Sequence, residues 1–325
     1  MTRPMEAALR PPGSLHGAPI PLTSDVAHLR TAIVNVAFVG APEAGARGWV
    51  LVDAGIAGYA DHIADAAARR YGEGVRPAAI VLTHGHFDHV GSLRALAERW
   101  DVAVYAHPLE LPYLTGRSNY PPPDPTVGGG AMARFASLYP KHPIDLGSRV
   151  QPLPADGSVP GMPGWRWIAT PGHSPGHVSF FRDADRTLIA GDAFVTTKQE
   201  SALAVLTQRP ELHGPPMYFT PDWERARLSV ERLADLEPAI AITGHGPPMR
   251  GPSLAAELIE LARDFGERAV PPHGRYVGHP AIADERGVVS VPPAPPDPLP
   301  KALLGVGAAV ALGMLASTLA RRGEE

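Results

Sequence analysis

The first half of the chain alternates short apolar runs with segments of helical periodicity. The apolar runs are rich in β-branched side chains and are bounded by glycine or Ala-Pro, which is typical of buried strands. The segment from Ser92 opens with a capping residue and places Leu93, Leu96 and Ala97 at helical spacing. We expect strands at 31–40, 49–53, 78–83 and 102–106, and helices at 57–71 and 92–100. This alternation predicts a layered α/β fold.

A long irregular insertion, residues 108–160, separates this half from a second strand-rich half. Insertions of this length are usually functional. After the insertion, three closely spaced apolar runs predict an antiparallel meander. We expect its strands at 165–170, 178–181 and 187–192, then a loop over 193–221, a helix over 222–236, a strand over 239–243 and a helix over 253–269.

The last 55 residues differ in composition from this body. Residues 271–300 carry nine prolines, which indicates a linker. Residues 302–320 are uncharged and would span roughly 28 Å as a helix, close to the thickness of a bilayer core. We therefore expect one main domain over 1–270, a proline-rich linker over 271–300 and a C-terminal hydrophobic helix, a membrane anchor, within 301–325.

The first 26 residues contain no apolar run of signal-peptide length. With an anchor inserted last, we expect the domain to lie on the cytoplasmic face of the inner membrane. The alternative for 302–320 is a helix packed on the domain or a frayed tail, because alanine and glycine are weakly apolar.

Charge and cysteine content exclude several kinds of partner and of chemical site. Lysine and arginine number 29 against 33 aspartate and glutamate, a formal net charge of −4, which argues against a nucleic-acid partner. The chain has no cysteine, so disulfides, thiolate metal ligands and cysteine nucleophiles are excluded. Any metal must be held by carboxylates and by some of the 14 histidines.

The strongest local signal is the run Thr83-His-Gly-His-Phe-Asp-His89, between an expected strand and an expected helix. Its His84, His86, Asp88 and His89 are imidazole and carboxylate donors within six residues, enough to serve two ions. The alternative is a polar loop of surface histidines.

Three further candidates follow later in the chain. They are His173 in TPGHSPGH, Asp192 in IAGD and His245 in TGHG, each at the end of an expected strand and beside glycine. The ordered set, spanning roughly 30–265, resembles the HxHxDH pattern and the separate His, Asp and His ligands of the metallo-β-lactamase superfamily.

The resemblance implies an αββα four-layer sandwich with a dinuclear site at one edge of two facing sheets. One metal would be bound by His84, His86 and His173, the other by Asp88, His89 and His245, with Asp192 bridging. The cofactor would be two Zn²⁺ ions, with iron or manganese as alternatives. A hydroxide shared by the two ions would attack the substrate, and Asp88 would be catalytic as a proton relay.

Residues outside this set have two interpretations each. Asp53 is either a turn residue or a hydrogen-bond acceptor for a ligand histidine. His177 falls outside the family pattern and is expected to be structural. His213 and the loop 193–221, with its apolar residues 217–219, either line a cleft or pack on the core.

The resemblance favours hydrolysis of an ester, lactone or thioester in a small molecule. An aspartate at the bridging position, without cysteine, is similar to the glyoxalase II, lactonase and phosphodiesterase branches of the superfamily. The alternatives are a phosphodiesterase, an iron-dependent oxygenase or redox protein on the same fold, and a non-catalytic binding protein. We expect no nucleic-acid partner and membrane attachment through 302–320, and a homodimer stays open.

Overall fold

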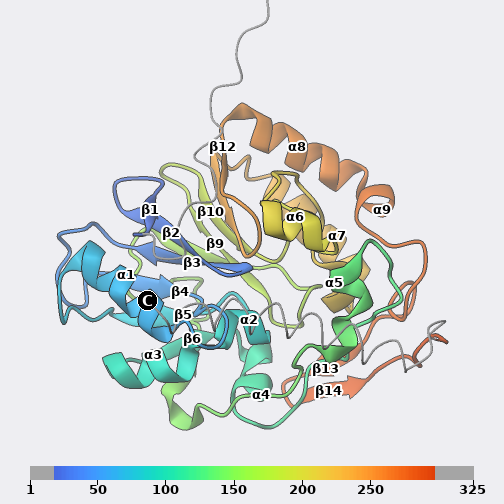
Figure 1. The fold of residues 1–325 in the computed structure, drawn as a ribbon, viewed down its shortest axis with the longest axis horizontal. Helices are drawn as coiled ribbons and strands as arrows, with labels where there is room; N and C mark the ends of the chain where they lie inside the picture. Colours follow the sequence, from blue (N-terminus) through green and yellow to red (C-terminus); the bar gives the residue numbers. More distant parts are fainter. Residues whose placement is uncertain (1–17, 297–325) are drawn as a thin grey trace, which may run out of the picture.

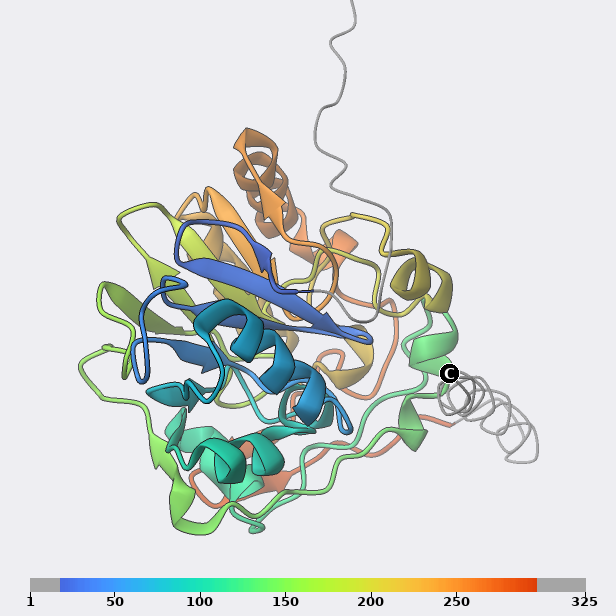
Figure 2. The ribbon, with the colours of Figure 1, turned by 60° about the vertical axis from the view of Figure 1, so that its left-hand side comes forward.

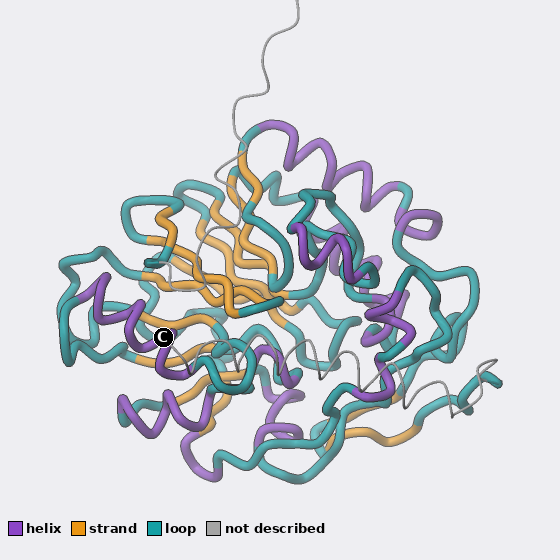
Figure 3. The backbone as a smooth tube through the Cα atoms, viewed as in Figure 1, coloured by secondary structure: helices purple, strands orange, loops and turns teal. Residues whose placement is uncertain are grey.

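Two β-sheets form the centre of the computed structural model, which describes residues 18–296 (Figures 1 and 3). The first sheet follows sequence order: β1 (Ile20–Pro21), β2 (Val26–Thr31), β3 (Val34–Val39), β4 (Val50–Val52), β5 (Ala79–Val81), β6 (Val104–Ala106) and β7 (Val150–Pro152). The second has the order β12 (Met249–Arg250), β11 (Ile240–Thr243), β10 (Thr187–Gly191), β9 (Val178–Arg182) and β8 (Trp165–Ala169). Strands β8, β9 and β10 form the expected antiparallel meander.

The sheets pack face to face, and helices cover both outer faces. Side chains such as Val52 from the first sheet and Phe180 from the second fill the space between them. The helices are α1 (Ala60–Tyr71) and α3 (Leu93–Trp100) against the first sheet, and α7 (Trp223–Ala234) and α8 (Pro252–Arg263) against the second. Figures 1 and 2 show α1 and α8 on opposite sides of the strands from two directions. The expected αββα layering is therefore present within residues 18–296.

Local sequence explains where the helices begin and which face they bury. Asp222 precedes α7 and accepts a hydrogen bond from the backbone N–H of Arg225, 3.0 Å away, so the helix begins at a side-chain cap. Within α7, Ala226, Val230 and Leu233 recur at helical spacing and are buried against the second sheet.

Two expected elements differ from the structure. The strand expected at 31–40 corresponds to β3, which pairs with the preceding β2 in a hairpin whose turn places Ala32 at a φ of 58°. In β2 the polar side chains of His28 and Arg30 alternate with apolar ones, which is a strand pattern but lacks the continuous apolar run on which the expected strands rest. The helix expected at 253–269 is divided at Asp264 into α8 and the short α9 (Phe265–Arg268).

The two long loops contain short helices. Within the insertion these are the 3-10 helices η1 (Pro108–Glu110), η2 (Ala136–Leu138) and η3 (Gly147–Arg149) and the α-helices α4 (Leu111–Leu114) and α5 (Ala131–Arg134). The later loop contains α6 (Ala202–Thr207) and η4 (Met217–Phe219). The remaining short helix, α2 (Phe87–Val90), lies between β5 and α3.

Part of the expected linker is folded onto the domain. Tyr276 is buried, and its hydroxyl donates to the backbone carbonyl of Pro122. Strands β13 (Ile282–Asp284) and β14 (Gly287–Ser290) pair as a hairpin. The backbone N–H of Val288 in this hairpin donates to the Ser118 hydroxyl, 3.1 Å away. Proline content suggested an extended chain here, but contacts with the insertion hold 271–290 against the domain.

Between residues 18 and 296, every helix is too short or too polar to cross a bilayer. The hydrophobic segment 302–320 lies outside the described residues, and its role as an anchor stays a prediction.

Replacing Phe180 by alanine tests the packing between the sheets. Phe180 is fully buried there, so we expect the free energy of unfolding to fall by about 3–5 kcal/mol. Leu228 on α7 is 48% exposed, and Leu228→Ala should change the same quantity by no more than about 0.5 kcal/mol. Urea unfolding followed by circular dichroism measures both, and equal losses would contradict this account of the core.

Candidate metal centre

All seven candidate ligands lie together at one end of the two sheets. Each follows a strand: His84 and His86 come after β5 with Asp88 and His89 on α2, His173 lies between β8 and β9, Asp192 follows β10, and His245 follows β11. None of the seven is more than 7% exposed. The first sheet therefore supplies four of the side chains and the second sheet supplies three.

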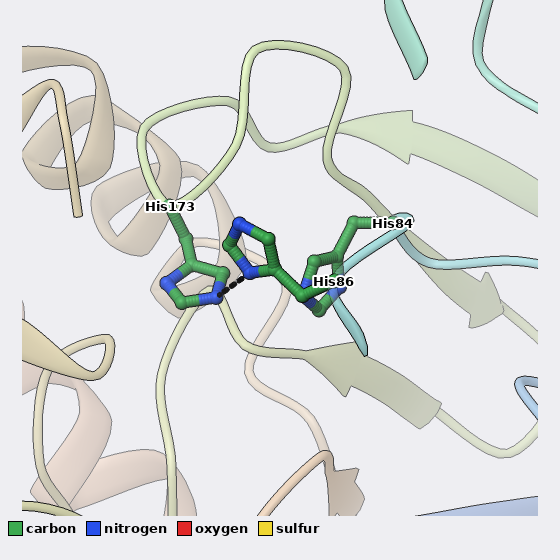
Figure 4. A group of neighbouring side chains, drawn as sticks. All are labelled: His84, His86 and His173. Carbon is green, nitrogen blue, oxygen red and sulfur yellow. Dashed lines mark hydrogen bonds between the residues drawn. The ribbon is translucent and has the colours of Figure 1, made fainter. Parts of the chain in front are cut away.

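The donor atoms fall into three overlapping groups in which all atoms lie within 4.8 Å of one another. The groups are His84, His86 and His173; His84, His89 and Asp192; and Asp88, His89 and His245. Figure 4 shows the first group, where Nδ1 of His86 and Nε2 of His173 are 2.9 Å apart. The first and third groups share no residue, so the cluster has two separate sets of three donors.

Asp53 and Thr83 orient the rings of His84 and His89 through hydrogen bonds to Nδ1. The Asp53 carboxylate accepts hydrogen bonds from Nδ1 of His89 and from the Thr83 hydroxyl, both at 2.8 Å. Because that hydroxyl donates to Asp53, its oxygen accepts from Nδ1 of His84 at 3.1 Å. The hydrogens on Nδ1 leave Nε2 of His84 and His89 as free donors to a metal.

His173 and His245 are oriented in the same way. Nδ1 of His245 donates to the Ile33 carbonyl at 2.7 Å. The Thr220 hydroxyl donates to the Pro216 carbonyl, so it faces Nδ1 of His173 at 3.4 Å as an acceptor. In both rings Nε2 is turned toward the cluster.

Asp192 contacts both separate groups. Its Oδ2 lies 3.4 Å from Nε2 of His173 and 3.1 Å from Nε2 of His245, and its Oδ1 lies 3.5 Å from Nε2 of His89. Its backbone N–H donates to Nε2 of His177 at 2.9 Å. His177 thus fixes Asp192 and lies outside the three donor groups, in line with the structural role expected for it.

Burial sets the protonation of several of these groups. It lowers the pKa of His86 to about 3 and holds the pKa values of His84 and His173 well below the usual histidine range, so the three rings are neutral. Burial alone would raise the pKa of Asp192, but the rings of His245 and His89 outweigh it and hold that pKa well below its usual range. Burial alone would lower the pKa values of His89 and His245, but the Asp192 carboxylate outweighs it and raises both. Neutral imidazole and ionised carboxylate are the forms that bind metals, so these two rings would release a proton when a metal binds.

Several donor atoms are buried without a hydrogen-bond partner among residues 18–296. They are Nε2 of His84, Nε2 of His89 and Oδ1 of Asp192. A buried polar atom left unpaired costs about 1–3 kcal/mol, and these three belong to one donor group. Metal cations bound in the cluster would satisfy all three atoms, so the residues present fit a metal centre.

Asp53 fills both roles considered for it. Its φ of 61° is the left-handed turn conformation that aspartate tolerates, and the turn aims its carboxylate at His89. His213 lies outside the three donor groups, with its Nε2 2.9 Å from the Glu211 carboxylate.

A small cavity opens beside the cluster. Asp88 and Phe87 of α2 lie in its wall, together with residues from the insertion and from the later loop. The insertion supplies Met132 and Tyr139, and the later loop supplies Tyr218 and Phe219. Both long loops therefore contribute to the cavity, and of residues 217–219 the last two face it.

Two residues that hold the loops of the candidate ligands were not predicted from the sequence. Glu110 accepts hydrogen bonds from both loops that carry His86 and His173, and Asn35 donates to the two carbonyls on either side of His245. Their one sequence signal is a polar residue inside an apolar run, PLELPYL for Glu110 and VNVAFV for Asn35.

Comparisons with known proteins agree with this geometry. The family model of the metallo-beta-lactamase superfamily matches residues 29–245. A Bacillus subtilis (strain 168) relative named probable metallo-hydrolase YflN is 50% identical over 246 residues, which cover 76% of this chain and 93% of the relative. Another from the same organism, probable metallo-hydrolase YybB, is 32% identical over 196 residues, covering 60% of this chain and 74% of the relative.

A solved structure shares the fold. The crystal structure of a beta-lactamase domain protein from Burkholderia ambifaria aligns with a TM-score of 0.53 at 19% identity, covering 78% of this chain and 79% of the other. Identity this low supports the fold alone, whereas the family model and YflN match across the strands and loops that carry the cluster. YflN and YybB are both named as probable metallo-hydrolases, and this chain belongs to the metallo-β-lactamase superfamily.

Proposed function

We propose that the protein is a dinuclear metal-dependent hydrolase acting on an ester, lactone or thioester. One cation would be held by His84, His86 and His173, the other by Asp88, His89 and His245, with Asp192 shared. The observation that carries the proposal is the presence of two disjoint three-donor groups that Asp192 contacts together. When bound, a pair of divalent cations supplies Lewis acidity and lowers the pKa of water toward neutrality.

Side chains of the protein have further roles beside the cations. Asp192 contributes negative charge between the two groups. Asp88 lines the cavity beside His245 and can hold or pass a proton to a leaving group, and burial raises its pKa. The aromatic wall limits the access of water to the reacting bond.

The cavity wall supports an uncharged acyl substrate. Its apolar residues offer surface to a hydrocarbon group, and no lysine or arginine is among the described residues that line it. Away from the proposed cations, an anionic group on the acyl chain would therefore leave water without a cationic side chain to receive it. This favours substrates with neutral acyl chains over those whose acyl chain carries a carboxylate.

The donor types indicate a class of transition metal and do not single out one element. Imidazole and carboxylate suit zinc, and they also suit iron and manganese. We propose two Zn²⁺ ions.

The shared aspartate gives a direct test. Purified protein should hold about two divalent ions per chain and lose activity with a chelator. Asp192→Asn keeps the size of the side chain but removes its charge, so we expect at least one ion to be lost. The value of kcat/KM should fall by about 100-fold or more. Metal analysis and ester hydrolysis measure both. Asp61→Asn, an equivalent change at an exposed side chain, should leave both unchanged; metal content retained in Asp192→Asn would refute the shared ligand.

The charge of the cavity wall predicts substrate preference. Neutral acyl esters should be hydrolysed with higher kcat/KM than matched esters that carry a carboxylate. Met132→Lys adds a cation to the wall and should shift the ratio toward the carboxylate ester by about fivefold, the value of a partly exposed ion pair. Leu138→Lys adds the same charge at a 51% exposed site outside the wall and serves as the control. An equal shift in both variants would contradict a role for the wall.

A further inference from the structure

The Glu110 side chain lies between two of the loops that carry candidate ligands. Its Oε2 accepts hydrogen bonds from the backbone N–H of Gly85, 2.9 Å away, and from the Tyr120 hydroxyl. Its Oε1 accepts from the Ser174 hydroxyl and from the backbone N–H of Gly176, both at 2.8 Å. The residue is fully buried, so its polar atoms depend on these donors rather than on water.

Both loops are shaped to let this carboxylate approach. A Cβ added to Gly85 would lie 2.5 Å from the Tyr120 hydroxyl oxygen. A Cβ added to Gly176 would lie 2.9 Å from Cγ of Glu110. A larger residue at Gly85 would displace the Tyr120 hydroxyl from Glu110, and a larger residue at Gly176 would displace Glu110 itself.

Glu110 contacts the loops that carry one donor group, which consists of His84, His86 and His173. Gly85 lies between His84 and His86, and Ser174 directly follows His173, so the carboxylate ties together the backbone that carries all three. The Tyr120 ring also packs on the His86 ring, with centroids 4.6 Å apart.

The other separate group has its own supports. His89 is held by Asp53, and Nδ2 of Asn35 donates to the carbonyls of Thr243 at 2.9 Å and Gly246 at 2.7 Å, on either side of His245. Among residues 18–296, neither Asp53 nor Asn35 hydrogen-bonds to Glu110 or to its four donors. Asp53 reaches both groups, because it also accepts from Thr83 behind His84, whereas the Glu110 contacts are confined to the loops of the first group.

We propose that Glu110 is a positioning residue for the metal held by His84, His86 and His173, and that it does not support the metal held by Asp88, His89 and His245. The inference rests on the proposed dinuclear function. A carboxylate that accepts one hydrogen bond from the His86 loop and two from the His173 loop fixes the distance between His86 and His173 before a metal arrives. This preorganisation raises affinity at that position alone.

Isosteric variants separate the two positions. In Glu110→Gln, one oxygen still accepts from one loop, but the amide NH₂ faces a backbone N–H of the other loop, which cannot accept a hydrogen bond. Asn35→Asp is the counterpart at the other position, because it sets a carboxylate oxygen against two carbonyls. Each change conserves shape and alters one support.

Zinc affinity is measured in full-length protein by competition with a chromophoric chelator. His245→Ala leaves only the three-histidine position intact, and His86→Ala leaves only the other. We expect Glu110→Gln to weaken zinc binding about 10- to 100-fold in the His245→Ala background and to leave it unchanged in the His86→Ala background. Asn35→Asp, tested with His86→Ala, should weaken the remaining position.

The outcomes distinguish the two proposals. Zinc bound by both backgrounds, but weakened equally or not at all by Glu110→Gln, overturns the positioning role and leaves the dinuclear function standing. Absence of zinc binding in wild-type protein overturns both. If Glu110→Gln fails to fold by circular dichroism, Tyr120→Phe takes its place. This variant removes one of the four donors, and it should lower affinity in the His245→Ala background only.

Discussion

The burial of seven imidazole and carboxyl side chains at one end of two sheets is the constraint on which this structure depends. Such groups are costly inside a protein unless each polar atom has a partner. The chain meets this requirement because Nδ1 of most rings faces a fixed partner, which is Asp53, the hydroxyl of Thr83 or Thr220, or a backbone carbonyl. Nε2 of these rings is then directed into the cluster. The same hydrogen bonds that make burial tolerable also orient the cluster.

The cluster also joins the two halves of the fold. The first sheet supplies the donors near β5 and α2, and the second supplies those after β8, β10 and β11. Asp192 lies where these contributions meet, held from the second sheet by His177 and in reach of rings from both. A shift of one sheet against the other would separate the donors, so the packing around Phe180 contributes to the geometry of the centre as well as to stability.

The sequence predicted the parts of the molecule that depend on local pattern. Apolar runs ending in His84, Asp192 and His245 showed both the strands and the ligands that follow them. The supports were not predictable, because Glu110 bonds to residues 25 and 66 positions away and Asn35 to residues more than 200 away. The proline content of 271–290 was misleading for the same reason, since distant contacts with the insertion decide its conformation.

The aromatic wall beside the metal centre belongs to a small cluster of its own. Val127, Ala133, Ala136, Tyr218 and Phe219 pack together from the two long loops, apart from the three clusters that hold the sheets and outer helices. Phe219 of this cluster also packs on the His86 ring, with ring centroids 4.8 Å apart. The outline of the cavity is therefore decided by packing between two loops, while the donor atoms beneath it are placed by the ends of the sheets.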